Sequence, residues 1–343
     1  MRVECSNCHK VYNIPDEKLQ DKKKIAFECP ACKAIIRVDL KPVSAKAESA
    51  APSQKETEIQ SGGEALKKDI LKNLKFLLPM PHVMLKAREI MSDPNSDFEE
   101  INKVLIADPA MAAEVLKLAN SSYYGMSGKV SSIHQAIVLL GIEILLQMIT
   151  VAGTSKMLGN RMKGYGLESG VLWRHSIAVA VCSRIIAIRK DKKLGNDAFS
   201  AGLIHDMGKL ILDPYLFKRK DIFNDCLEKS HGDLLFAEQQ VLGLDHSEIA
   251  YELCKSWKIP EWQAVAIRYH HQPSIAKGSE LAHILHMADV VSMKCGFGSG
   301  EQFTTEYKIE DGTMEALGIR QEDMNKIIDE VMDAVEIIEE NTL

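Results

Sequence analysis

From residue 66 onward, apolar residues recur mostly every three or four positions, which is the spacing of one face of an α-helix. Candidate capping residues mark several helix starts: Pro81 and Asp97 each precede an apolar segment, and Asp108 stands before Pro109. Outside the first 40 residues no run alternates apolar and polar positions between turn signals. The pattern therefore predicts an all-α main domain, with further helices at 132–148, 173–189, 198–203, 247–257, 260–271 and 280–295.

The C-terminal segment combines many charges with an apolar stripe. Residues 301–343 contain thirteen acidic residues against three basic ones, which leaves the rest of the chain slightly basic. An apolar stripe on a helix has to cover another surface, and that surface is either the preceding helices or a second subunit. The stripe consists of Ile319, Met324, Ile327, Ile328, Val331, Val335 and Ile338.

Composition describes a globular protein with a tether. The chain has 343 residues, of which 46% are hydrophobic, enough to build real cores. Residues 41–64 are rich in Ala, Ser, Glu and Lys and cannot bury enough surface to order themselves, so we expect a flexible linker. The first residues lack an apolar signal region, and the longest apolar stretch, 137–153, is interrupted by Glu143 and Gln147. We therefore expect a cytoplasmic protein without membrane insertion.

The N-terminal cysteines have the spacing of a zinc site. Two CxxC pairs separated by twenty residues are typical of a zinc ribbon, in which each pair brings two thiolates to one tetrahedral ion. Redox disulfides and an iron–sulfur cluster are the alternatives. A unit of about 40 residues has too little hydrophobic core to fold without a bound metal or another cross-link. Residues 1–40 are therefore expected to bind Zn²⁺ through Cys5, Cys8, Cys29 and Cys32.

Charge argues against nucleic acid as a partner. The net charge of the chain is −6, and residues 1–40 carry only eight basic against six acidic residues despite the run Lys22–Lys24. Such a field is too weak for autonomous nucleic-acid binding. A zinc-ribbon nucleic-acid adaptor stays as an alternative function.

Histidine and aspartate residues in the second half of the chain form a candidate metal set. His205–Asp206 and His270–His271 are adjacent pairs, and His175 and Asp289 stand on either side of them. Imidazoles and carboxylates bind divalent metals that activate water. The alternative is structural: His205 and Asp206 could form a buried hydrogen-bonded pair, with Gly208 allowing two helices to approach.

The adjacent pair His270–His271 and five further histidines need separate interpretations. His270 and His271 point about 100° apart on an ideal helix, so both reach one site only where the helix ends, as Pro273 makes plausible. Five further histidines have no partner at ligand spacing and are expected on the surface or in packing positions. They are His82, His134, His231, His283 and His286.

Two long segments contain specific motifs. In the first segment they are DPAM, KLANSSYYG and AIVLLG, at residues 108–111, 117–125 and 136–141. In the second they are WRHS, AGLIHDMGKL, LDHSEIA and YHHQP. By these motifs the two segments resemble the HDOD family, the HD-related output domain of bacterial signalling proteins. Residues 1–40 separately resemble the zinc ribbons at the N-termini of some bacterial regulators. The expected domains are a zinc ribbon at 1–40, a linker at 41–64, an HDOD domain at 65–296 with lobes at 65–160 and 161–296, and an acidic helical extension at 297–343.

The HDOD resemblance implies an all-α two-lobed helical bundle whose second lobe is related to the HD phosphohydrolases. By that resemblance His175, His205, Asp206 and Asp289 hold a first divalent metal, which would be Fe, Mn or Mg, and His246, His270 and His271 hold further metal. Lys209 would contact a substrate phosphate. The departures are that QPSIAKGSE, residues 272–280, lacks the Gly-Tyr-Pro element of cyclic di-GMP hydrolases, and that Val171 stands where some of them place a glutamate ligand.

The resemblance also implies the function. HDOD domains are regarded as signalling modules without demonstrated hydrolase activity, so we expect a bacterial regulatory protein that acts through partner or ligand binding by a catalytically degenerate HD-related domain. A metal-dependent phosphohydrolase of a nucleotide second messenger is the alternative enzyme. A protein partner in a signalling pathway is expected, and a nucleotide ligand and a homo-oligomer stay open. Tyr123 and Tyr124 either line a cleft between the lobes or, as we favour, seal a core there.

Overall fold

The computed structural model describes residues 2–4, 11–13, 24–28, 32, 35–39, 66–74, 78–92, 98–125, 130–298 and 308–342. The chain divides into two compact units, Met1–Thr57 and Glu58–Leu343. The expected tether, 41–64, and the cysteines Cys5, Cys8 and Cys29 lie outside the described residues. Each unit is described by itself.

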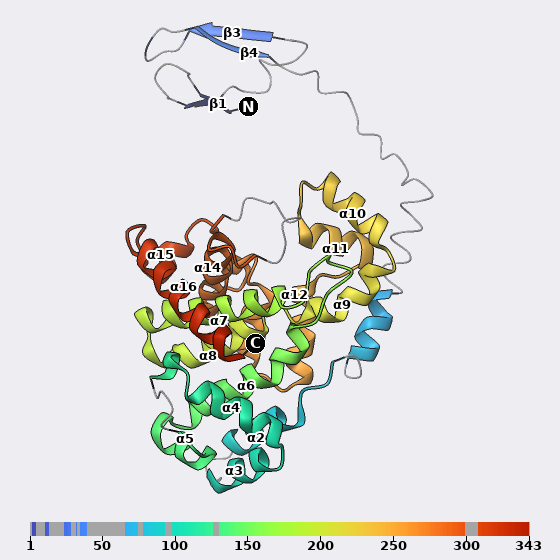
Figure 1. The fold of residues 1–343 in the computed structure, drawn as a ribbon. Coiled ribbons are helices and arrows are strands. Elements are labelled where there is room, and N and C mark those ends of the chain that lie inside the picture. Colours follow the sequence, from blue (N-terminus) through green and yellow to red (C-terminus); the bar gives the residue numbers. More distant parts are fainter. Residues whose placement is uncertain are drawn as a thin grey trace. The chain divides into compact units, whose positions relative to one another are not determined.

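The N-terminal unit contains two antiparallel hairpins (Figure 1). Strand β1 (Arg2–Glu4) pairs with β2 (Val11–Asn13), so that Val3 faces Tyr12. Strand β3 (Lys24–Glu28) pairs with β4 (Ile35–Asp39), so that Ala26 faces Arg37. In the sequence, each CxxC pair stands between the two strands of one hairpin.

The helical unit begins with the N-terminal lobe. Residues 66–74 are helical, and α4 (Pro109–Ala119) starts as expected, because the Asp108 side chain accepts a hydrogen bond from the Met111 N–H. The lobe also contains α2 (His82–Ser92), α3 (Phe98–Ile106), η2 (Ser122–Tyr124), α5 (Ile133–Leu140) and α6 (Ile142–Leu158).

One expected helix is wrong in this lobe. The pattern predicted a single helix over 132–148, but the chain breaks at Gly141 between α5 and α6. Gly141 has φ 84° and ψ 163°, a backbone conformation that is essentially restricted to glycine. The apolar spacing continues across the break, which is why periodicity alone did not show it.

The second lobe follows the expected helices closely. All the predicted helices are present, with ends shifted by up to three residues, and α9, α10 and α11 are additional. The elements are α7 (Val171–Lys190), η3 (Lys192–Leu194), α8 (Gly195–Ile204), α9 (Gly208–Phe217), α10 (Lys220–Lys229), α11 (Leu234–Leu242), α12 (His246–Ser256), α13 (Glu261–Arg268), η4 (Pro273–Ile275) and α14 (Glu280–Lys294). Among the described residues from 66 onward there are no strands, only one isolated bridge between Met162 and Leu167. The all-α two-lobed fold is confirmed.

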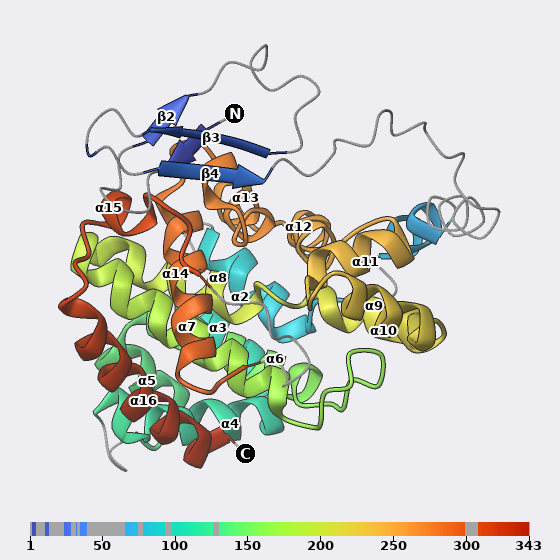
Figure 2. The same cartoon turned by 90° about the horizontal axis from the view of Figure 1, so that it is seen from above.

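The acidic C-terminal segment packs on this unit. It forms α15 (Thr313–Leu317) and α16 (Asp323–Thr342), and α16 lies against α7 and α4 (Figure 1 and Figure 2). Glu339 accepts two hydrogen bonds from Arg174, at 2.6 and 3.1 Å, and Glu330 accepts one from Arg189 at 2.6 Å. Of the two open alternatives, docking on the preceding helices is therefore correct. The buried part of the stripe is Ile319, Met324, Ile327, Val331, Val335 and Ile338.

Helix α7 runs through the core of the unit. Trp173, Ile177 and Val181 on it have no exposed surface, and α8, α14 and α16 all pack against it. Of the described helices only α7 is long and apolar enough to cross a membrane, but 72% of its most apolar window is buried inside the protein, as in a core helix. Tyr123 and Tyr124 are half-buried against the core, which supports packing rather than a cleft.

Candidate metal centre

Five helices bring the predicted histidines and aspartates to one place in the second lobe. His175 comes from α7, His205 and Asp206 follow α8, and Asp289 comes from α14. His246 is the first residue of α12, and His270 and His271 lie just after α13, which ends at Arg268. Because that helix ends, the two adjacent side chains reach the same site. All of these residues are buried except His271, whose side chain is 25% exposed.

Asp206 lies at the centre of the first group. Its Oδ2 is 3.4 Å from His175 Nε2 and 3.5 Å from His205 Nε2. Its Oδ1 is 3.3 Å from His246 Nε2. Asp289 Oδ1 lies 3.3 Å from the same His175 Nε2, so one imidazole faces both carboxylates.

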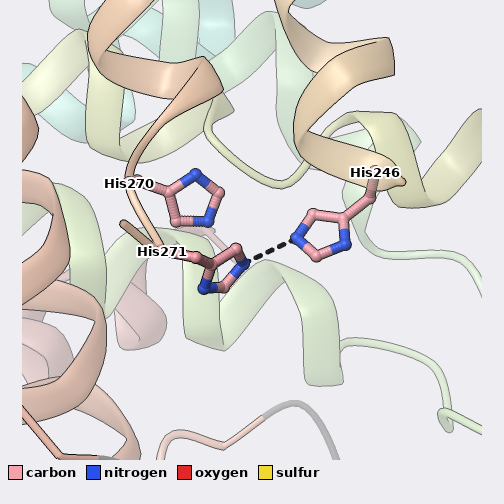
Figure 3. Close-up of side chains that lie close together, drawn as sticks. All are labelled: His246, His270 and His271. Atoms are coloured by element: carbon pink, nitrogen blue, oxygen red, sulfur yellow. Dashed lines mark hydrogen bonds between the residues drawn. The ribbon is translucent and has the colours of Figure 1, made fainter. Parts of the chain in front are cut away.

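The second group consists of His246, His270 and His271 (Figure 3). The Nε2 atoms of His246 and His271 are 2.9 Å apart, and the rings of His270 and His271 have centroids 3.9 Å apart. Ligand atoms of this group lie within 4.8 Å of one another, as do those of two further sets. The further sets are His175, His205 and Asp206, and His205, His270 and Asp289.

Hydrogen bonds fix how four of the imidazoles point. The Nδ1 of His205 donates to the Gly202 carbonyl and that of His270 to the Ile267 carbonyl, both at 2.7 Å. The Nδ1 of His175 donates to the Phe297 carbonyl at 2.8 Å. His246 Nδ1 donates to the Glu238 carboxylate at 2.8 Å. In each ring Nε2 is left to face the centre, which is the outer-shell arrangement of metal-binding histidines.

The donor set fits a divalent cation. The Nε2 atoms of His205 and His270 and the Oδ1 of Asp206 are buried and have no hydrogen-bond partner. Buried polar atoms are normally paired, so a cluster of unpaired lone pairs beside two carboxylates calls for a positive charge. Nitrogen and carboxylate donors of this kind suit Zn²⁺, Fe²⁺ or Mn²⁺.

The charges within the site are unequally distributed. Burial opposes charge on His175, but its contacts with Asp206 and Asp289 raise its pKa to about 9. Burial lowers the pKa of His270 to about 3, with His205 acting in the same direction. Burial also opposes ionisation of Asp289, yet the hydrogen bond from His175 holds the pKa of that carboxyl well below its usual range. The two carboxylates therefore favour a positive charge at His175 Nε2, and a metal ion bound there would take the place of a proton.

Lys209 lies beside Asp206, and Gly208 lies beside the backbone of His246. The resemblance gave Lys209 a phosphate contact, and the structure places its Nζ 2.5 Å from Asp206 Oδ2, with both side chains at most 5% exposed. At Gly208 a Cβ atom would lie 1.9 Å from the His246 carbonyl oxygen. The glycine therefore lets α9 approach the start of α12, as expected.

Two supporting residues were missed by the sequence analysis. Glu238 on α11 is fully buried and accepts hydrogen bonds from the backbone and ring of His246 and from the Tyr165 hydroxyl at 2.6 Å. His286 was expected in a packing or surface position, and it is buried with its Nδ1 donating to the His270 carbonyl at 2.8 Å. Neither residue stands in a motif, and only the tertiary contacts reveal them.

The other histidines in the described part of the chain are not part of this site. His283 contacts Thr313 Oγ1 through its Nδ1 at 3.0 Å. His134 has a 65% exposed side chain, and His231 is exposed in a turn. His82 lies on α2 in the N-terminal lobe. Val171 is the first residue of α7, one turn before His175.

Comparison with known families agrees with this architecture. Residues 77–273, more than half of the chain, match the model of the HDOD domain. The chain belongs to the HDOD family. Residues 1–41 match the model of a zinc-ribbon domain. The HDOD match ends before α14, so Asp289 and His286 lie beyond the matched residues.

Relatives of this HDOD protein are distant. An uncharacterised protein of Treponema pallidum is 23% identical over 220 residues, and the match covers 62% of this chain and 41% of that protein. The chain thus spans about two fifths of the length of that curated relative.

Solved structures share the HDOD fold. An HDOD domain protein of unknown function from Geobacter sulfurreducens has a TM-score of 0.62 at 22% identity, covering 82% of this chain and 93% of that one. A candidate phosphohydrolase from Shewanella amazonensis has a TM-score of 0.62 at 21% identity, covering 80% and 98%. A candidate signal transduction protein from Marinobacter aquaeolei has a TM-score of 0.64 at 22% identity, covering 95% and 78%. Identities this low show a shared fold alone.

Proposed function

We propose that this HDOD protein is a regulatory module that holds a divalent metal ion in its second lobe and transmits a signal by binding a protein partner or ligand. His175, His205, Asp206 and Asp289 would hold the ion, and His246, His270 and His271 would extend the donor set. The observation that carries the proposal is that buried Nε2 atoms converge on two carboxylates. The Nδ1 atoms of the same imidazole rings are held by hydrogen bonds to backbone carbonyls. The signal-transduction name of one structural relative agrees with the regulatory part.

The burial of the candidate ligands favours a structural metal site over a catalytic one. Structural metal sites are closed, whereas catalytic sites keep a position open for water or substrate. The candidate ligands have at most 7% exposed side chains, apart from His271. The absence of a Gly-Tyr-Pro element in residues 272–280 points the same way. We therefore place this domain among signalling modules rather than cyclic di-GMP hydrolases.

The N-terminal unit would hold a second, separate metal. We propose that Cys5, Cys8, Cys29 and Cys32 bind one zinc ion between the two hairpins. The match to the zinc-ribbon model and the position of each CxxC pair between paired strands support this assignment. The domain limits of the chain are proposed as 1–40, 41–64, 65–296 and 297–343.

Metal analysis of three purified proteins tests both sites. The wild type is expected to contain zinc plus a second divalent metal, and the four-serine variant of the ribbon cysteines should lose only the zinc. The His205→Ala/Asp206→Ala variant should lose only the second metal. Equal metal content in the wild type and this double variant would contradict the proposed centre.

A phosphohydrolase is the second candidate function, favoured by the His and Asp side chains that come together in the site and by Lys209 Nζ beside Asp206. A bound divalent ion would lower the pKa of a water molecule that reached it. With manganese, iron or magnesium added, we expect cyclic di-GMP turnover to be absent or very low. Sustained turnover that disappears in the Asp206→Ala variant would establish the enzyme instead.

A further inference from the structure

His286 connects the candidate metal centre to a part of the chain outside the HDOD match. Its ring is buried on α14. Its Nδ1 lies 2.8 Å from the His270 carbonyl oxygen, and its Nε2 lies 2.8 Å from the backbone nitrogen of Glu310. A carbonyl only accepts and a backbone N–H only donates, so the imidazole is neutral with its proton on Nδ1. The ring therefore links two backbone segments directly.

Glu310 holds the same segment at its other end. Its carboxylate accepts hydrogen bonds from the Ser274 N–H at 3.0 Å and from the Ser274 hydroxyl at 2.7 Å. Between His270 and Ser274 the chain forms the turn that carries both His270 and His271. Residue 310 thus holds this turn directly at Ser274 and, through the His286 ring, at His270.

The C-terminal extension, of which residues 308–342 are described, also packs on α7, the helix that carries His175. Helix α16 packs on α7, and Arg174, the neighbour of His175, is held by Glu339 through two hydrogen bonds. The segment after α14 also supplies the Phe297 carbonyl to His175. Two elements of the candidate centre are therefore held by chain that follows α14.

We infer that His286 is a positioning residue through which the C-terminal extension orients His270 and His271 for metal binding. The inference rests on the metal centre proposed above. Removing a hydrogen bond that orients a metal ligand commonly changes metal affinity by 10–100-fold. The extension would thereby set how tightly the HDOD domain holds its ion.

Manganese binding to the full-length, zinc-loaded protein, followed by electron paramagnetic resonance, tests this inference, because thiolate sites disfavour Mn²⁺. His286→Phe removes both hydrogen bonds and should raise the Mn²⁺ Kd about tenfold or more. His286→Asn keeps a donor near the Nδ1 position and should stay within about threefold of the wild type, on the same basis. Glu310→Ala releases Ser274 and should weaken binding by about threefold or more.

His283→Phe is the matched control, since His283 lies on the same helix and contacts Thr313 of the extension but no candidate ligand. It should lower the thermal midpoint without changing the Mn²⁺ Kd. The inference is overturned if the wild type binds Mn²⁺ and His286→Phe binds it equally tightly, if Phe and Asn at 286 weaken binding alike, or if Glu310→Ala has no effect. A wild type that binds neither Mn²⁺, Fe²⁺ nor Zn²⁺ in this lobe would overturn the proposed function as well.

Discussion

Replacement of Asp206 by alanine should destabilise the metal-free protein strongly. The Asp206 carboxylate is 1% exposed and pairs with the Lys209 ammonium at 2.5 Å, and the lysine side chain is itself only 5% exposed. Removing the carboxylate leaves a buried positive charge without its partner and removes the contacts of three histidines. Breaking a buried ion pair by removing one partner typically costs about 3–5 kcal/mol, so we expect a loss of about 3 kcal/mol or more.

Denaturant unfolding in the presence of a chelator measures this loss. All three tryptophans, Trp173, Trp257 and Trp262, lie in the helical unit, so their fluorescence reports on that unit without the zinc ribbon. The Asp206→Ala/Lys209→Met double variant removes both charges and should recover about 1 kcal/mol or more relative to Asp206→Ala. The same unfolding series without chelator gives the additional contribution of bound metal.

Two results would refute this reasoning. A loss below about 0.5 kcal/mol for Asp206→Ala would mean that the carboxylate behaves like a solvated surface group. A double variant as unstable as the single one would mean that the unpaired Lys209 charge is not the cause of the loss.

Two further predictions concern the rest of the chain. A fragment of residues 1–42 should show dispersed amide NMR signals only with zinc, because the four thiolates supply the folding free energy of a unit too small for a core; equal dispersion with chelator would contradict this. Gly208→Ala should destabilise the helical unit by about 1–3 kcal/mol, because its Cβ would lie 1.9 Å from the His246 carbonyl oxygen. Gly278→Ala, whose Cβ meets nothing within 4 Å but whose φ is +77°, separates this clash from backbone strain; an equal loss at both positions would argue against the clash.

The sequence predicted the helices well because their apolar faces and caps are local features. Asp108, for example, caps α4 through a residue three positions away. Gly141 was missed because the apolar spacing runs through the break between α5 and α6, and only the backbone angles show it. Helices α9, α10 and α11 were not predicted either.

The candidate ligands were predictable as residue types but not as a geometry. The resemblance supplied the set, and the structure shows that His270 and His271 share a site because α13 ends at Arg268. Glu238 and His286 could not be predicted, since their role consists of hydrogen bonds to residues 8 and 16 positions away with no recurring spacing. The position of the C-terminal stripe was left open because an apolar face does not specify what it packs on.

The candidate metal centre draws its side chains from five helices between positions 175 and 289. Local contacts form early in folding, whereas contacts between distant parts of the chain form only after long loops have closed. The centre therefore cannot exist in a partly folded chain in which any of α7, α8, α12, α13 or α14 is detached. Bound metal would report that the whole lobe has assembled, and local opening of any one of these helices would give the ion a route out.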